Sequence, residues 1–215
     1  MNIKDETGLK VAEFLLQIKA IKLQPKNPFK WASGWNSPIY CDNRKTLSYP
    51  QIRTYIRQEL VKLIETEYST PDVIAGVATG GIAQGVLVAQ ELGIPFVYVR
   101  PQSKGHGLQN SIEGVIESGQ SVIVIEDLVS TGNSSLNAVQ TLREAGCDVK
   151  GMLAIFTYSF DISVENFKKN NCKLNTLTNY ETLVEQALES NYITEKDVES
   201  LKEWRTSPQT WNVKS

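Results

Sequence analysis

The stretch VIVIEDLVSTGNSSLNAV, residues 122–139, decides the fold class. It starts with four β-branched apolar residues, continues with the acids Glu126 and Asp127, passes through small residues at 130–134 and ends in a helix-like pattern. Four apolar residues in a row favour a strand buried on both faces, as in a parallel sheet that helices cover. Consecutive strand side chains face opposite ways, so the two acids can share a ligand only where the strand ends, and we place that end at Ile125.

The same alternation of strand and helix surrounds this stretch. Short apolar runs at 73–77, 96–99 and 152–156 predict three further strands. Helix-like stretches at 82–92 and 134–145 are each followed by glycine, the residue that commonly ends a helix. These elements predict an α/β domain with a parallel sheet flanked by helices.

Helical patterns are also expected at both ends of the chain. Apolar residues recur at helical spacing in 9–21 and again after Pro50, and residues from Val164 onward have the pattern of amphipathic helices. Between the first two, residues 29–50 are rich in Gly, Pro, Asn and Ser, which predicts short strands or irregular structure. The connection 100–119 is long, polar and contains four glycines, which favours a functional role.

The composition excludes several classes of protein. The 215 residues carry 22 basic and 24 acidic side chains, a net charge of −2, which argues against a nucleic-acid binder. There is one histidine, His106, so a site with several histidine ligands is excluded. A polar amino terminus, no long apolar stretch and three cysteines without CxxC spacing predict a soluble cytoplasmic protein with free thiols and no membrane segment.

The small residues at 130–134 have the chemistry of an anion site. Backbone N–H groups and hydroxyls at a helix amino terminus converge on a phosphate, and Gly132 permits close approach. The stretch contains neither the GK[ST] of a Walker loop nor a dinucleotide GxGxxG. The preceding acids fit a ligand that carries hydroxyls beside its phosphate, such as a ribose 5-phosphate, because carboxylates accept hydrogen bonds from a diol.

This pattern resembles the phosphoribosyl pyrophosphate (PRPP) signature of type I phosphoribosyltransferases. Three more segments resemble the orotate phosphoribosyltransferases in particular: WASGWNSPIYCDNR (31–44) their orotate-side segment, GVATGGIAQG (76–85) their pyrophosphate loop and RPQSKGHG (100–107) their mobile catalytic loop. Hypoxanthine and adenine transferases share the signature but are not similar in the first of these segments. The resemblance implies a type I phosphoribosyltransferase-like parallel sheet in a single domain over 1–215. In that domain a PRPP-binding core spans about 72–160, and 1–48 with the helical carboxyl-terminal elements forms a base-side hood.

The resemblance also implies a role for each site residue. The residues implied to bind PRPP are Thr79, Gly80, Arg100, Lys104, His106, Glu126, Asp127, Leu128, Val129, Ser130, Thr131, Gly132, Asn133 and Ser134. Arg100, Lys104, His106 and Asp127 are implied to be catalytic, and Ser130 and Arg44 to contact orotate. The two acids would hold the ribose hydroxyls and 130–134 the 5-phosphate. The implied cofactor is Mg²⁺, held mainly by PRPP oxygens without a direct protein ligand. The implied assembly is a homodimer in which the segment from Arg100 to His106 reaches the neighbouring site.

The chemistry of the transfer is consistent with the roles implied for the cationic residues of that segment. Displacing pyrophosphate from the anomeric carbon builds negative charge on the leaving group, which Arg100 and Lys104 would stabilise as it develops. His106 could donate a proton to the pyrophosphate, because imidazole titrates near neutrality. A solvated histidine with no role is the alternative.

The sequence departs from the better-known family pattern at Ala32, Gly80 and Pro101, where many members have lysine. Because the surrounding motifs are intact, the changes favour a second subtype in which Arg44 and Lys45 become candidates to neutralise the orotate carboxylate. For Arg44 the alternative is a surface arginine paired with a neighbouring acid.

Four aromatic residues near the two ends have simpler expected roles. Trp31 and Tyr40 are candidates to stack on the pyrimidine ring, with core packing or a dimer contact as the alternative. That alternative is favoured for Trp35, and packing of the terminal helix is expected for Trp204 near the carboxyl terminus.

The expected function is the conversion of orotate and PRPP into orotidine 5′-monophosphate (OMP) and pyrophosphate. Two alternatives remain open: another type I transferase acting on a purine base, and a non-catalytic regulator that keeps the PRPP fold. The cations in 100–106 argue against the regulator, which needs no leaving-group stabilisation.

Overall fold

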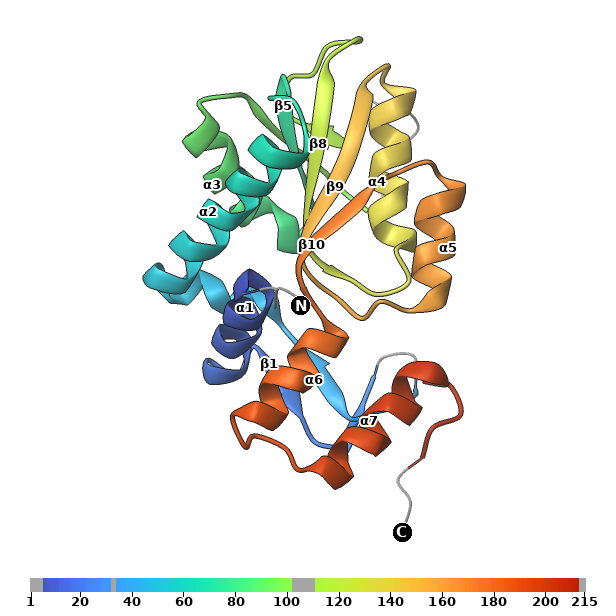
Figure 1. Ribbon diagram of the computed structural model, residues 1–215. Coiled ribbons are helices and arrows are strands. Elements are labelled where there is room, and N and C mark those ends of the chain that lie inside the picture. Colours follow the sequence, from blue (N-terminus) through green and yellow to red (C-terminus); the bar gives the residue numbers. More distant parts are fainter. Residues whose placement is uncertain (1–5, 32–33, 102–110, 213–215) are drawn as a thin grey trace. The chain divides into compact units, whose positions relative to one another are not determined.

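The computed structural model describes residues 6–31, 34–101 and 111–212 (Figure 1). They form two compact units. The larger unit comprises 49–177, and the smaller comprises the described parts of 1–48 and 178–215.

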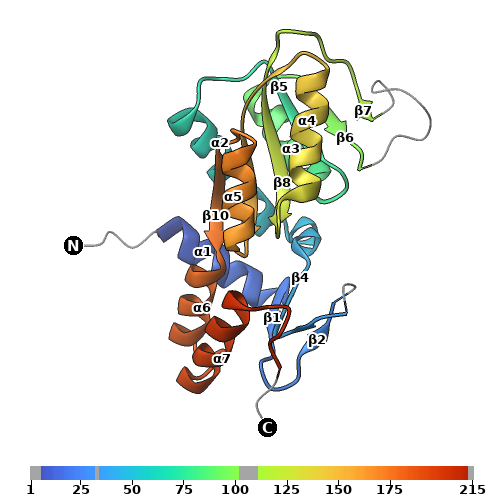
Figure 2. The same ribbon diagram turned by 90° about the vertical axis from the view of Figure 1, so that its right-hand side faces the viewer.

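A six-stranded sheet forms the centre of the larger unit, in the order β10-β9-β8-β5-β6-β7. The strands are β5 (Val73–Val77), β6 (Phe96–Val99), β7 (Ile112–Glu113), β8 (Ser121–Val129), β9 (Asp148–Thr157) and β10 (Leu174–Asn179). β5 is parallel to β6 and to β8, and β8 is parallel to β9. β7 runs antiparallel to β6 at the edge of the sheet (Figure 2). The predicted parallel sheet is therefore confirmed.

Helices cover both faces of this sheet. They are α2 (Pro50–Glu67), α3 (Gly80–Leu92), α4 (Asn133–Glu144) and α5 (Asp161–Lys169). Crossovers between parallel strands are right-handed, and β5 leads to β6 in one direction while β8 leads to β9 in the other. The two connecting helices must then lie on opposite faces, and Figure 1 shows α2 and α3 on one side of the sheet and α4 and α5 on the other.

The reversal of direction between β5 and β8 is a topological switch point. Loops that leave the carboxyl ends of two such strands diverge, and the crevice between them is where open α/β sheets bind ligands. The segments that leave these two ends are 78–79 after β5 and 130–132 after β8. The topology thus places the two phosphate-type motifs of the sequence side by side, at the carboxyl ends of the central strands β5 and β8.

The predicted end of the third strand at Ile125 is wrong, because β8 continues to Val129. Its pairing with β5 does stop at Ile125, opposite Gly76. Its pairing with β9 continues to Val129, because β9 itself runs on to Thr157. The two acids therefore lie beyond the end of the β5 ladder but within the β9 ladder.

Two other expectations near the ends also need correction. Residues 174–179, expected to be helical, form the strand β10 beside β9. The first helix, α1, ends at Gln17 rather than Ile21, and Ile21 begins a strand. Both errors arise from polar or short segments in which a strand is stabilised by its neighbour rather than by its own pattern.

The described part of the smaller unit combines short strands with three α-helices and a 3₁₀ helix. Its described elements are α1 (Glu6–Gln17), β1 (Ile21–Leu23), β2 (Phe29–Lys30), β3 (Asn36–Ser37), β4 (Ile39–Cys41), the 3₁₀ helix η1 (Asn43–Ser48), α6 (Tyr180–Glu189) and α7 (Glu195–Thr206). β1 pairs with β4 and β2 with β3, both antiparallel. The fully buried Trp204 ring lies 5.5 Å from the rings of both Trp31 and Tyr180. The expected packing role of Trp204 is confirmed.

Within the described ranges, no helix combines the length and apolar character needed to cross a membrane. Cys41, Cys147 and Cys172 are free thiols. Cys147 and Cys172 are buried, as expected of small apolar side chains, whereas Cys41 is half-buried.

Candidate functional site

The two motif turns meet at the switch point of the larger unit. A Cβ atom added to Gly80, the first residue of α3, would lie 2.2 Å from the carboxyl carbon of Asp127. The Asp127 side chain therefore lies directly against the amino terminus of α3, where a negative charge is stabilised. The structure brings Thr79 and Gly80 together with Asp127, three residues that the sequence assigns to one ligand.

This contact also gives a physical reason for one departure from the family pattern. Any side chain at position 80 would overlap the Asp127 carboxylate in its present place. Lysine, which many family members have at this position, does not fit with this arrangement of Asp127. Glycine at 80 and the close approach of Asp127 are two parts of one arrangement.

Glu126 holds the two ends of the phosphate-type turn. Its side chain is only 5% exposed. One carboxyl oxygen, Oε1, accepts a hydrogen bond from the backbone N–H of Asp127 (2.9 Å), and the other, Oε2, accepts one from the Ser135 hydroxyl in the first turn of α4 (2.9 Å). The contacts join β8, before the turn, to α4, after it.

Burial, and next the charge of Asp127, raise the pKa of Glu126 to about 8. Burial thus favours the protonated form of Glu126, whereas Asp127 is half-buried and closer to solvent. The two adjacent acids have different environments, so only Asp127 is suited to act as a charged acceptor for a diol.

We expect Glu126→Gln to stabilise the fold increasingly as the pH rises from about 5 to about 8. The folded-state pKa of Glu126 lies above its ordinary value of 4.5, so the folded chain holds a proton that the unfolded chain releases in this window. Stability from this group is therefore lost with rising pH, by an amount on the order of a few kcal/mol, and glutamine removes the loss. Urea unfolding of the wild type and the variant at several pH values measures the difference in their unfolding free energies. A difference that stays constant with pH would contradict the prediction.

The turn after β8 is shaped by Gly132. Its φ of +82° lies in the left-handed region, and it forms the N-cap of α4, whose fourth residue, Leu136, donates its N–H to the Gly132 carbonyl (2.8 Å). Within the described chain no side chain caps this helix terminus. Its first N–H groups, in the exposed residues Asn133 and Ser134, can then serve an anion.

Arg100 directly follows β6, which pairs with β7. Its backbone N–H donates to the Ser111 carbonyl (2.8 Å), and its guanidinium pairs with Glu113 at 3.0 Å. Lys104 and His106 belong to 102–110, which lies outside the described residues. Ala32 also lies outside them, in 32–33. The structure thus describes both anchors of the predicted catalytic segment but not the segment itself.

Arg44 and Lys45, the candidates to neutralise the orotate carboxylate, belong to the smaller unit, whereas Ser130 belongs to the larger one. The Arg44 side chain is 61% exposed and its Nε lies 2.7 Å from Asp42, the surface pair that the alternative interpretation predicted. Lys45 donates to the Lys19 carbonyl at 3.1 Å. A role for Arg44 in orotate binding stays a prediction.

Two aromatic candidates take part in packing within that unit. The Trp31 indole N–H donates to the Ile39 carbonyl (3.1 Å), and its ring meets Trp204 edge-on. Tyr40 is 39% exposed, with its ring 5.6 Å from that of Phe29. The contacts of Trp31 match the packing alternative.

Sequence reasoning missed two residues near the turn: Ser135, which donates to Glu126, and Asn166, which donates to the turn itself. Ser135 directly follows the small residues of the motif, so its place in the sequence could have marked its hydroxyl as a candidate hydrogen-bond donor near the turn. Asn166 on α5 donates to the turn from a position 32 residues beyond the motif's last residue, Ser134, and no local pattern marks it. Over the described residues there is no cluster of three His, Cys, Asp or Glu side chains that could hold a metal ion.

Comparisons with known proteins agree with this geometry. The family model "Phosphoribosyl transferase domain" matches residues 47–184. The orotate phosphoribosyltransferase of Porphyromonas gingivalis is 55% identical over 206 residues, covering 96% of this chain and 98% of that protein. The orotate phosphoribosyltransferase of Phocaeicola vulgatus is 56% identical, covering 94% of this chain and 95% of that protein. Among solved structures, orotate phosphoribosyltransferase from Aeropyrum pernix matches with a TM-score of 0.74 and 26% identity, covering 86% of this chain and 99% of that one.

Proposed function

The chain belongs to the orotate phosphoribosyltransferase family, and we propose that the switch-point site of its larger unit binds the PRPP used in this transfer. The enzyme transfers the 5-phosphoribosyl group of PRPP to orotate, yielding OMP and pyrophosphate. The observation that carries our proposal is the contact between Gly80 and Asp127, which joins the pyrophosphate motif to the ribose phosphate motif.

Different described residues bind the phosphate, hydroxyl and pyrophosphate groups of PRPP. The N–H groups and hydroxyls of 130–134 bind the 5-phosphate, and Asp127 accepts hydrogen bonds from the ribose hydroxyls. Thr79 and Gly80, at the start of α3, bind the pyrophosphate. Glu126, which the sequence also assigned to the ribose, contributes instead by holding the turn, because both of its oxygens are engaged within the protein.

In the reaction the bond from the anomeric carbon to pyrophosphate breaks, a bond to an orotate nitrogen forms, and that nitrogen releases its proton. Positive charge develops on the ribose and negative charge on the leaving group. We assign Arg100, Lys104 and His106 to the leaving group, where a cation stabilises charge as it develops and His106 can supply a proton. Ser130 and Arg44 are assigned to orotate.

Magnesium fits this site as a companion of the substrate. Mg²⁺ prefers oxygen ligands and is commonly held by substrate phosphates with one or two carboxylates, and PRPP brings many such oxygens. The half-buried Asp127 is the acidic side chain that faces this region from β8. The ion would neutralise charge on the pyrophosphate and ribose oxygens.

We further propose a homodimer in which the segment from Arg100 to His106 serves the neighbouring site, and a cytoplasmic location. The proposal is supported by the described residues that flank the segment: Arg100 and Ser111 are hydrogen-bonded to each other beside β6 and β7, at the edge of the sheet. The three free thiols support a reducing compartment.

The function is tested by following orotate absorbance after PRPP and Mg²⁺ are added to the purified protein. Loss of orotate with matching release of pyrophosphate is expected. A panel of purine bases in the same assay tests the alternative substrate. Turnover of a purine without consumption of orotate would overturn the assignment, and no turnover of any base would favour a regulator.

We expect Asp127→Asn to raise the KM for PRPP at least about tenfold, because the amide cannot replace a charged acceptor for two hydroxyls. The fold should tolerate the change, since asparagine has the same shape against Gly80. Steady-state kinetics and thermal melting measure the two effects.

Asp72→Asn is the matched control for this prediction. Asp72 directly precedes β5, so it lies at the opposite end of this strand from the candidate site. Its carboxylate accepts hydrogen bonds from the Ser121 N–H (2.7 Å) and hydroxyl (2.6 Å). This control should leave the KM for PRPP unchanged. If Asp127→Asn instead lowered the melting temperature without changing the KM for PRPP, Asp127 would have a structural role only.

A further inference from the structure

The turn at 130–134 contains acceptor atoms as well as donors. A phosphate is bound by N–H and O–H groups and repelled by carbonyl oxygens, so any carbonyl near the anion has to be directed elsewhere. The Thr131 carbonyl and the Asn133 side-chain oxygen are two such acceptors within the turn. A cradle for phosphate needs both of them occupied by something other than the ligand.

One side chain of α5 engages both acceptors. The Nδ2 group of Asn166 lies 3.0 Å from the Thr131 carbonyl oxygen and 3.1 Å from Asn133 Oδ1. Since a backbone carbonyl can only accept, the Asn166 atom beside it must be the amide NH₂, whose two hydrogens suffice for two bonds. With its oxygen held in this way, the remaining polar group of the Asn133 side chain is a donor.

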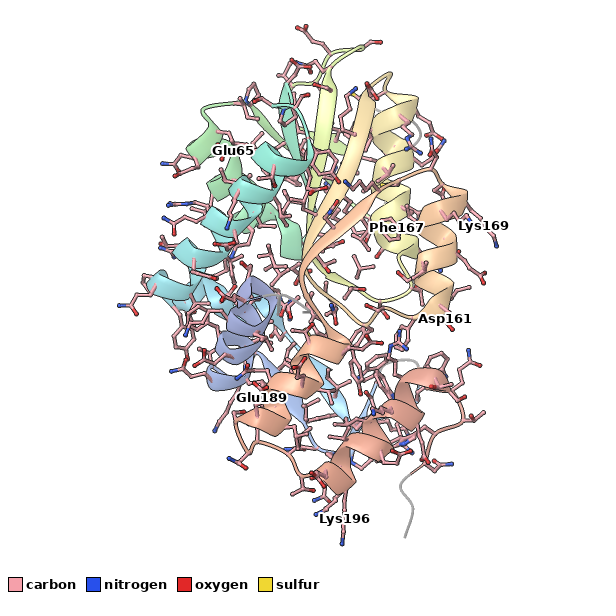
Figure 3. All side chains as sticks on the ribbon, in the orientation of Figure 1. Glu65, Asp161, Phe167, Lys169, Glu189 and Lys196 are labelled. Atoms are coloured by element: carbon pink, nitrogen blue, oxygen red, sulfur yellow. The ribbon has the colours of Figure 1, made fainter. Side chains whose placement is uncertain are left out.

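The next residue of α5 fixes the same turn by packing. Phe167 is 4% exposed, and Figure 3 shows its side chain on the side of α5 toward α4. A Cβ atom added to Gly132 would lie 2.7 Å from the Phe167 ring, so the ring lies against the left-handed glycine between the two held acceptors. Hydrogen bonds and packing from one helix thus act on three consecutive residues of the turn.

We propose that Asn166 is a positioning residue for the 5-phosphate of PRPP and OMP. It turns the acceptors of the cradle away from the anion and leaves the donors of 130–134 facing it. The proposal rests on the assignment of 130–134 to the 5-phosphate. Asn166 itself acts through Thr131 and Asn133.

The forward and reverse reactions separate this role from a general one. PRPP and OMP both carry the 5-phosphate, whereas orotate and pyrophosphate lack it. We expect Asn166→Ala to raise the KM for PRPP and for OMP roughly three- to tenfold, which is the range for loss of about one hydrogen-bonded group. The KM values for orotate and pyrophosphate should stay within about twofold.

Asn166→Asp provides the sharper test. It keeps the size of the side chain but replaces the donor with a negatively charged acceptor beside the Thr131 carbonyl, so its KM values for PRPP and OMP should exceed those of Asn166→Ala. Val164→Ala on the same helix is the control, because that side chain is 61% exposed; its kinetics should match the wild type.

Ribose 5-phosphate provides a readout that does not depend on turnover. Calorimetric titration should show weaker binding to both Asn166 variants than to the wild type and to Val164→Ala. Equal affinity of all four proteins, or a uniform rise of all four KM values, would overturn the role of Asn166. Failure of the wild type to consume orotate would overturn the proposed function instead, and the ribose 5-phosphate titration would still decide the role of Asn166.

Discussion

Replacing Gly81 with alanine is expected to lower the unfolding free energy by about 3 kcal/mol or more. Helix propensity alone predicts the opposite sign, because alanine stabilises a helix interior by about 1 kcal/mol relative to glycine. The added Cβ atom, however, would lie 2.2 Å from the carbonyl oxygen of Ile125 and 3.2 Å from the Glu126 Cα. Both are backbone atoms of β8 in the centre of the sheet, so neither can move without disturbing its strand pairing.

Gly93→Ala is the matched control, because Gly93 caps the other end of the same helix. Its φ of +67° makes alanine unfavourable, but no atom lies within 4 Å of the added Cβ. This variant should lose only about 1–2 kcal/mol, the usual cost of a left-handed conformation. Urea unfolding of both variants separates the collision from the general effect of removing a glycine. Equal losses in the two would show that α3 can shift away from β8.

The sequence predicts the larger unit well because its local patterns agree with the packing of α3 against β8. Helix α3 packs against the backbone of β8, and the run of buried residues from Val122 to Ile125 allows helices on both faces. The boundaries of β5 and β6 match the predicted runs, and Gly93 ends α3 in the left-handed conformation that its position indicated. Here the local pattern and the tertiary contacts favour the same structure.

The errors fall where a neighbouring segment decides the structure. β8 extends past Ile125 because β9 continues beside it, and the polar run Leu174–Asn179 becomes a strand because it pairs at the edge of the sheet. A pattern within one segment contains no information about the length of its partner.

The candidate site divides in the same way. The resemblance supplies the residue types at 79–80 and 126–134. The adjacent acids Glu126 and Asp127 differ in burial and in what they contact, Ser135 for Glu126 and Gly80 for Asp127, and these contacts depend on the folded structure. Asn166 reaches the turn from a different helix. Positioning residues of this kind are set by packing between elements, so they are found only once the elements are placed.

Replacing Lys104 with alanine is expected to lower kcat by about 100-fold or more while leaving the fold intact. Lys104 lies outside the described residues, but the strands that anchor its segment do not depend on it. Tyr98 pairs with Glu113 and Val99 with Ile112, and Arg100 contacts both Ser111 and Glu113. These contacts should hold the base of the segment in the variant, so its melting temperature should match that of the wild type.

The size of the expected loss follows from where charge changes during the reaction. PRPP is highly charged already in the ground state, and binding groups such as 130–134 act on it equally before and during the transfer. A cation assigned to the leaving group acts most strongly when the bond breaks, so its removal should reduce kcat and kcat/KM together. Lys62→Ala on α2, whose side chain is 67% exposed, controls for the loss of a lysine. Full turnover by Lys104→Ala would contradict the assignment of the segment from Arg100 to His106 to the departing pyrophosphate.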